Sequence, residues 1–86
     1  MKKVEIKNAR FLSREALNCS QYGNPRSRVW FARPDGEEIC ATTATDAACG
    51  YAVRNWEGAS LADIVMHYTR NGNAIIDYIT PKRSNG

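Results

Sequence analysis

The chain has no apolar run approaching the ~20 residues needed to cross a membrane. Residues 1–7 carry a charged side chain at every second or third position and lack the hydrophobic segment of a secretory signal. The three cysteines are odd in number and form no Cys-x-x-Cys pair, which argues against a secreted disulfide framework. We therefore predict a cytoplasmic location and no membrane contact.

The usual signatures of cofactor and catalytic sites are also missing. There is no Gly-rich phosphate loop and no nucleotide fingerprint. The soft metal ligands Cys19, Cys40, Cys49 and His67 are not grouped in the close pairs that structural zinc sites use, so packing in the core is the simpler interpretation of the cysteines. Cys49 with His67 as its base would make a nucleophilic pair, but Cys49 stands in a buried-looking helical pattern. We expect no cofactor, no metal and no enzymatic activity.

Composition indicates one ordinary globular domain. The chain has 86 residues, of which 43% are hydrophobic and 24% charged, with a formal net charge of +3. That charge permits a polyanionic partner without requiring one. We predict a single domain over residues 1–81, a flexible tail over 82–86, and a monomer or weak homo-oligomer.

The N-terminal pattern predicts a bent strand over residues 4–12. Val4 and Ile6 alternate with charged residues, after which the apolar positions move to Ala9 and Phe11. Such a slip by one residue is what a β-bulge produces. Residues 13–24 are mostly polar, and we expect a loop there.

A hairpin and a helix are predicted next. Residues 28–33 and 38–43 are β-rich, and Pro34 and Gly36 between them are typical of a tight turn. A helix is expected to start at residues 43–46 and to end at Gly58. The residues expected on its buried face are Ala48, Tyr51, Ala52 and Trp56.

Residues 60–69 fit either a helix or a strand, and we prefer the strand. Asn71-Gly72 between two apolar runs is a strong hairpin signal, and residues 75–79 supply the partner. The predicted order is then β-β-β-α-β-β, mainly β with one helix, as in a small, partly open, OB-like barrel. The alternative is an α+β sheet with two helices.

The segment from Tyr22 to Phe31 is the main candidate for a binding site. Gly23 and Pro25 favour a rigid turn that leads into an aromatic strand. If Val29 and Phe31 fill the core, Trp30 lies on the other face between arginines. A buried Trp30 with ordinary solvated arginines is the competing interpretation. The candidate binding residues are Arg10, Tyr22, Arg26, Arg28, Trp30 and Arg33.

Several short motifs resemble small proteins encoded by phages and prophages. They are Gly23-Asn24-Pro25-Arg26-x-Arg28-Val29, Asp35-Gly36, Thr45-Asp46-Ala47-Ala48-x-x-Tyr51, and Thr69-x-x-Gly72 with Ile76-Asp77. The resemblance spans residues 8–79 and departs in a longer stretch at 57–63. The resemblance implies a viral or mobile-element accessory protein. Because that family has no assigned activity, the resemblance identifies no catalytic or binding residue.

Two functions follow as expectations. A basic and aromatic patch suits stoichiometric binding of a host protein, as an inhibitor of host defence (anti-CRISPR-like) or of host machinery, because Trp, Tyr and Arg are enriched at interface hot spots. The alternative is single-stranded nucleic-acid binding on an OB-like barrel.

Overall fold

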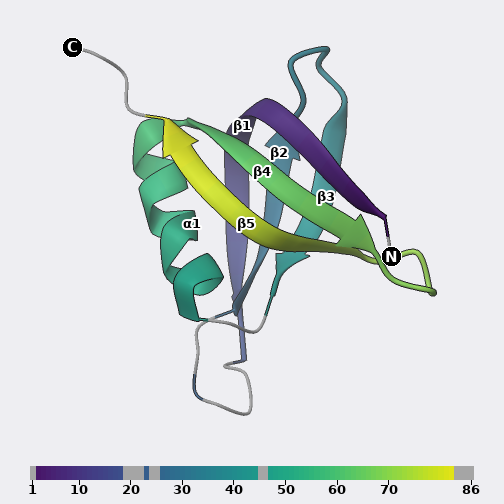
Figure 1. The fold of residues 1–86 in the computed structure, drawn as a ribbon. Coiled ribbons are helices and arrows are strands. Elements are labelled where there is room, and N and C mark those ends of the chain that lie inside the picture. The colour runs from purple at the N-terminus through teal and green to yellow at the C-terminus, as the bar shows by residue number, and fades with distance from the viewer. Residues whose placement is uncertain (1, 19–22, 24–25, 45–46, 83–86) are drawn as a thin grey trace.

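The computed structural model describes residues 2–18, 23, 26–44 and 47–82, and of residues 47 and 48 the backbone alone. The elements are β1 (Lys3–Leu17), β2 (Arg26–Ala32), β3 (Glu38–Thr43), α1 (Ala47–Ala59), β4 (Leu61–Tyr68) and β5 (Ala74–Lys82). The protein is mainly β with a single helix in the described chain, in the predicted order (Figure 1). In that part of the chain no helix is long and apolar enough to span a bilayer.

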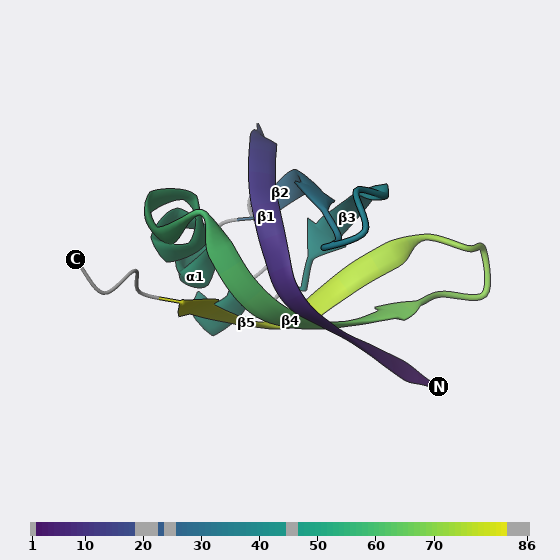
Figure 2. The same cartoon turned by 90° about the horizontal axis from the view of Figure 1, so that it is seen from above.

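The five strands form a ring in the order β1-β2-β3-β5-β4, with β4 returning to β1. All neighbours are antiparallel except β3 and β5, which run parallel and pair only through Thr42 with Ile75 and Thr43 with Ile76. The strands are strongly bent around the core (Figures 1 and 2). A ring with one short seam agrees with the partly open, OB-like barrel expected from the sequence.

The bend in β1 lies where the hydrophobic pattern slips. Its pairing with β4 shifts between Ile6 and Ala9, and Asn8 has a positive φ of 56°. A second shift, between Phe11 and Ser13, interrupts the pairing with β2. The predicted bulge is therefore confirmed.

The predicted loop over residues 13–24 is wrong at its beginning. β1 continues to Leu17, which pairs with Arg26 of β2. The pairing of the backbone with β2 fixes this segment, although its side chains are largely polar and exposed. A boundary predicted from hydropathy alone therefore lies too early in the chain.

The two predicted hairpins are confirmed. Between β2 and β3, Gly36 has a φ of 95°, and its N–H donates to the carbonyl of Arg33. β4 is a strand and not a helix, so the two-helix alternative is wrong. Gly72 has a φ of 84° in the connection to β5, and its N–H donates to the carbonyl of Thr69.

β5 is longer than predicted. It includes Pro81 and Lys82, which pair with Ala62 and Leu61, so the tail expected from residue 82 is wrong at Lys82. At Pro81, β4 is the one neighbour paired with β5 in the described chain, and proline is tolerated at such an edge. Residues 83–86 lie outside the described residues.

The helix buries Trp56 as predicted, but its buried face does not include Tyr51. Cys49, Val53 and Trp56 are buried, whereas Tyr51 is 59% exposed. These buried positions are four and three residues apart, so they also form one helical face. The prediction placed Tyr51 on the buried face by its helical spacing from Ala48, and for this residue it was wrong. The predicted partner Ala48 and the start of the helix at residues 45–46 lie outside what is described.

Trp56 is the centre of the core. It is fully buried, its Nε1 donates a 3.0 Å hydrogen bond to the carbonyl of Ala9, and its ring lies against Phe11 and Phe31 at centroid distances of 5.7 and 5.3 Å. One side chain thus joins α1 to β1 and β2. The helix ends one residue after Gly58, and Ser60, with a φ of 73°, has the left-handed conformation that the prediction assigned to the glycine.

Candidate functional site

The side chains of β2 alternate as the sequence predicted. Val29 and Phe31 are fully buried in the core. Arg26, Arg28 and Trp30 lie on the opposite face of the strand, where Arg28 is exposed and the other two are half-buried. Trp30 is therefore accessible, and the interpretation that it belongs to the core is wrong.

Neighbouring strands extend this surface on both sides. Cys40 and Thr42 of β3 pair with Trp30 and Arg28, while Glu15 of β1 pairs with Arg28 from the other side. Arg10 of β1 pairs with Ala32, two residues beyond Trp30 on the same face. We call this surface the β2 face. Its members are Arg10, Glu15, Arg26, Arg28, Trp30, Cys40 and Thr42.

The arginines of the β2 face differ in their partners. Arg28 Nη1 lies 2.9 Å from Glu15 Oε1, and both side chains are solvent-exposed. Arg26 and Arg10 have no acidic partner among the described residues. The Nε of Arg26 is buried and has no hydrogen-bond acceptor in that part of the chain. A buried donor without an acceptor carries an unfavourable desolvation free energy.

A shallow cavity of about 330 Å³ adjoins the β2 face at the seam between β3 and β5. Arg26 and Arg28 line one side, Thr42 and Ile75 lie across the seam, and Asn73 comes from the β4–β5 connection. Its volume is at the lower end of the range for small-molecule sites. A chain lying on the β2 face would have its backbone groups within reach of this cavity.

Not all of the predicted binding residues share the β2 face. Arg10, Arg26, Arg28 and Trp30 do, by strand register. Arg33 lies just beyond β2, where its backbone N–H donates to the carbonyl of Glu37 in the turn. Tyr22 lies outside the described residues.

Sequence analysis missed the residues that other strands contribute. Cys40 could have been found from the sequence, because the register of the predicted hairpin pairs it with Trp30. Asn73 could not, because its place depends on the parallel seam between β3 and β5, for which the sequence has no local signal.

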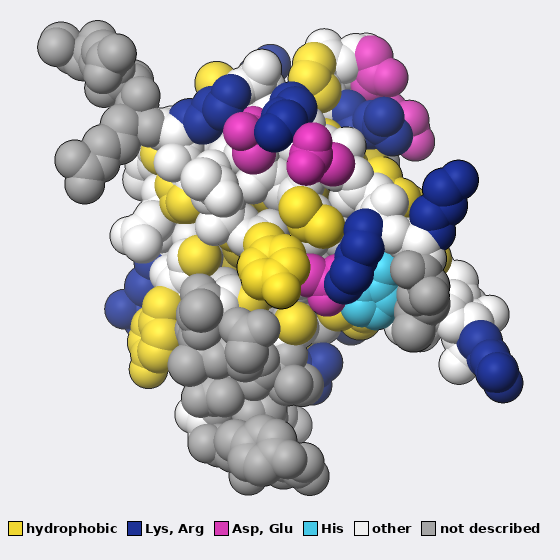
Figure 3. Space-filling model, in the orientation of Figure 1, with side chains coloured by type: hydrophobic (Ala, Val, Ile, Leu, Met, Phe, Trp, Pro, Cys, Tyr) yellow, Lys and Arg dark blue, Asp and Glu magenta, His cyan; other side chains and the backbone are white. Residues whose placement is uncertain are grey.

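A second cluster of charged side chains lies on β1, β4 and β5. His67 Nδ1 is 2.7 Å from Asp77 Oδ2, and Lys3 Nζ is 2.9 Å from the same oxygen. Burial alone would raise the pKa of Asp77, but hydrogen bonds from His67 and Lys3 and their charges outweigh it and lower the pKa. The face seen in Figure 3 mixes basic and acidic side chains, with the histidine among them. This cluster supports the sheet and is separate from the β2 face.

The residues that could act as a nucleophile or hold a metal ion do not form a site in the described chain. Cys49 is 3% exposed and its Sγ lies 3.2 Å from the carbonyl oxygen of Ile76, so the thiol faces the core rather than a substrate. Within the described residues, no three His, Cys, Asp or Glu side chains gather to hold a metal ion.

Comparisons with protein-family models, with curated proteins and with solved structures find no match for this chain.

Proposed function

We propose that this chain is a non-enzymatic binding protein that takes single-stranded nucleic acid on the β2 face. The supporting observation is the combination of a partly exposed Trp30 with Arg26 and Arg28 on the same face of the second strand of an OB-like ring, beside a cavity that reaches the β4–β5 connection. In OB folds, the face of strands 2 and 3 and the loop between strands 4 and 5 are where oligonucleotides bind.

The residue types suit that ligand. Stacking of a base on an aromatic ring contributes about 1–3 kcal/mol and does not depend on base identity, so Trp30 would bind without sequence preference. Arg26 has no competing carboxylate among the described residues, and a phosphate would supply it with an acceptor. Arg28 would exchange the exposed carboxylate of Glu15 for a phosphate. With so few charges we expect micromolar rather than nanomolar affinity.

A host protein is the second candidate partner, favoured by the mixed charge of the β2 face. Glu15 lies within the patch and Glu38 is exposed at its edge, and both would repel a phosphate backbone while suiting a protein surface. The resemblance to phage accessory proteins supports this candidate, as an inhibitor acting in the host cytoplasm by stoichiometric capture. Trp and Arg are common at the centres of such interfaces.

Fluorescence anisotropy with a labelled single-stranded oligonucleotide distinguishes the two. We expect binding at low salt that weakens steeply as salt rises, because phosphate contacts release counterions. Arg26→Gln and Trp30→Ala should each reduce affinity, whereas Lys7→Gln, a matched loss of charge away from the β2 face, should not. Absence of oligonucleotide binding by the folded protein at 50 mM salt would overturn the proposal and leave the protein partner.

A further inference from the structure

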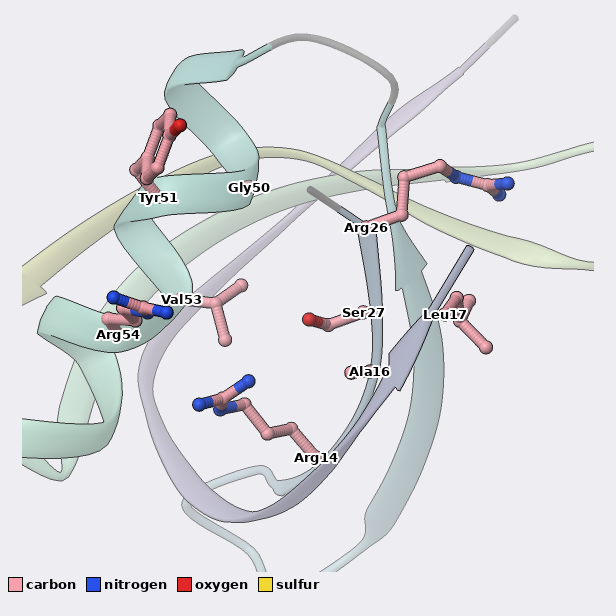
Figure 4. Close-up of a pocket in the computed structure, with 9 residues that line it drawn as sticks. All are labelled: Arg14, Ala16, Leu17, Arg26, Ser27, Gly50, Tyr51, Val53 and Arg54. Atoms are coloured by element: carbon pink, nitrogen blue, oxygen red, sulfur yellow. The ribbon is translucent and has the colours of Figure 1, made fainter. Parts of the chain in front are cut away.

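A second cavity, of about 230 Å³, lies between α1 and the adjoining parts of β1 and β2 (Figure 4). It is distinct from the β2 face, because it lies on the inward side of the strands. The strands contribute Arg14, Ala16 and Ser27 to its lining, and the helix contributes Gly50, Val53 and Arg54.

The strand side of this cavity is polar where the ring would otherwise be apolar. Arg14 pairs with the fully buried Val29, and Ala16 pairs with the buried Ser27, so Arg14 and Ala16 lie on the side of β1 that lines the cavity, although both are solvent-exposed. Ser27 is only 6% exposed, and its hydroxyl points into the cavity (Figure 4). Its backbone N–H is already used, since it donates to Thr43 Oγ1 at 3.1 Å.

Two guanidinium groups lie on the same side of this space. Arg14 extends from β1 toward α1, and Arg54 lies on α1 beside Val53 (Figure 4). Arg14 Nε lies 2.9 Å from Glu57 Oε1, which leaves its two terminal nitrogens available to a ligand. Arg54 has no acidic partner in the described part of the chain. The neighbourhood therefore has two cations and one carboxylate.

Arg26 also lines this cavity, but its guanidinium points away from it (Figure 4). The β2 face and this cavity therefore depend on different charged groups, and they can be tested separately.

We propose that this cavity is an oxyanion site that binds a phosphoryl group through Arg14, Arg54 and the hydroxyl of Ser27. The planar fork of a guanidinium matches phosphate oxygens, and the hydroxyl of Ser27 adds a hydrogen-bond donor beside the two arginines. The volume is below the range of about 300–1,000 Å³ for drug-sized ligands, so the fit is to a phosphoryl group with little else. The phosphoryl group can come from free phosphate or from the terminal phosphate of a nucleic-acid strand.

Amide NMR titration at constant ionic strength tests this site. With inorganic phosphate, the signals of Ser27, Gly50 and Val53 are expected to shift and to saturate below about 10 mM, with chloride as the reference anion. Arg54→Gln should weaken phosphate binding at least tenfold. Arg10→Gln, which removes one arginine from the β2 face, should leave it unchanged.

The second arm compares two oligonucleotides that differ only in a 5′-phosphate. Tighter binding of the phosphorylated strand to the wild type but not to Arg54→Gln assigns the site to a strand terminus. Equal binding of both strands, with saturable binding of inorganic phosphate, assigns it to a small phosphate ligand. Shifts that stay linear to 50 mM phosphate, or an Arg54→Gln variant that binds phosphate like the wild type, would overturn the site. Because Arg54 is exposed on the helix, the Arg54→Gln variant should fold. The titration with inorganic phosphate does not depend on Trp30, so failure of the β2-face proposal would leave its result unchanged.

Discussion

The backbone N–H of Asn8 donates a 3.0 Å hydrogen bond to Asp63 Oδ1, joining the bulge of β1 to β4. Lys82 of β5 adds to this contact, with its Nζ 2.7 Å from Asn8 Oδ1 and 3.3 Å from Asp63 Oδ1. Asn8 has a positive φ, a conformation that asparagine tolerates better than most residues. The sharpest bend of the ring is thus held by a carboxylate from one strand and an ammonium from another.

Asp63→Ala should therefore lower the free energy of unfolding by about 1–2 kcal/mol, because it leaves a backbone donor without its charged acceptor. Urea unfolding followed by circular dichroism measures the change. Lys7→Gln is the matched control. It removes a longer, exposed ion pair with the same carboxylate (3.7 Å), which we expect to contribute less than about 0.5 kcal/mol. Equal effects of the two substitutions would contradict this account of the bulge.

Stability should fall in acid through Asp63 and Asp77. The hydrogen bond from the Asn8 N–H lowers the pKa of Asp63, against the opposing effect of burial and with help from Lys82 and Lys7. For Asp77, burial raises the pKa, but hydrogen bonds and charge from His67 and Lys3 have the larger effect, so the pKa is lowered overall. A carboxylate whose folded pKa lies below its unfolded value stabilises the fold above that unfolded value, near pH 4, and loses this effect as pH falls through the folded pKa.

Urea midpoints measured between pH 7 and pH 2 test this. The wild type should lose stability mainly below about pH 4. The double variant Asp63→Asn/Asp77→Asn should start lower and lose less over the same interval. Parallel pH profiles for the two proteins would show that these carboxylates do not cause the acid sensitivity.

Trp56→Phe should be among the most destabilising conservative substitutions in this chain. It removes the hydrogen bond to the carbonyl of Ala9 and leaves space beside Phe11 and Phe31, for an expected loss of about 2–4 kcal/mol. Trp30→Phe should cost less than about 1 kcal/mol, because that ring is half-buried on the outer face. Acrylamide should quench the fluorescence of the wild type more than that of Trp30→Phe, whose remaining tryptophan is enclosed. Similar quenching of both would contradict the accessibility of Trp30.

The thiols should differ in reactivity. Cys40 is exposed and Cys49 is buried, so in a Cys19→Ser background a thiol reagent should modify one cysteine rapidly and the other only on unfolding. Peptide mass spectrometry identifies the modified residue. Because Cys40 pairs with Trp30, a bulky maleimide on it should also block ligand binding to the β2 face, while Cys40→Ser should not. Native labelling of Cys49 would mean that α1 opens readily from the core.

The sequence was sufficient where local chemistry decides the structure. Gly36 and Gly72 are placed where the backbone needs a positive φ, so both hairpins were predictable. The move of the apolar positions from Ile6 to Ala9 predicted the bulge, because a strand has a period of two residues. The alternation about Trp30 predicted the β2 face in the same way.

The sequence was insufficient where residues far apart in the chain determine the local structure. The second half of β1 has few apolar residues, and its strand conformation comes from pairing with β2. That register places Arg14 on the side of β1 that lines the cavity beneath α1, so this cavity had no local signal. The buried face of α1 was misjudged at Tyr51, which helical spacing placed with Trp56 but which is exposed.

The measurement that bears most directly on the central proposal is the salt dependence of single-strand binding by the wild type and by the Arg26→Gln/Trp30→Ala double variant. The proposal predicts that the wild type binds at low salt and that its affinity falls steeply with rising salt, with a slope of about one to three on a logarithmic plot, given the few arginines of the β2 face. It also predicts that the folded double variant binds at least tenfold more weakly, with Lys7→Gln unchanged. A double variant that binds like the wild type would contradict the assignment of the β2 face.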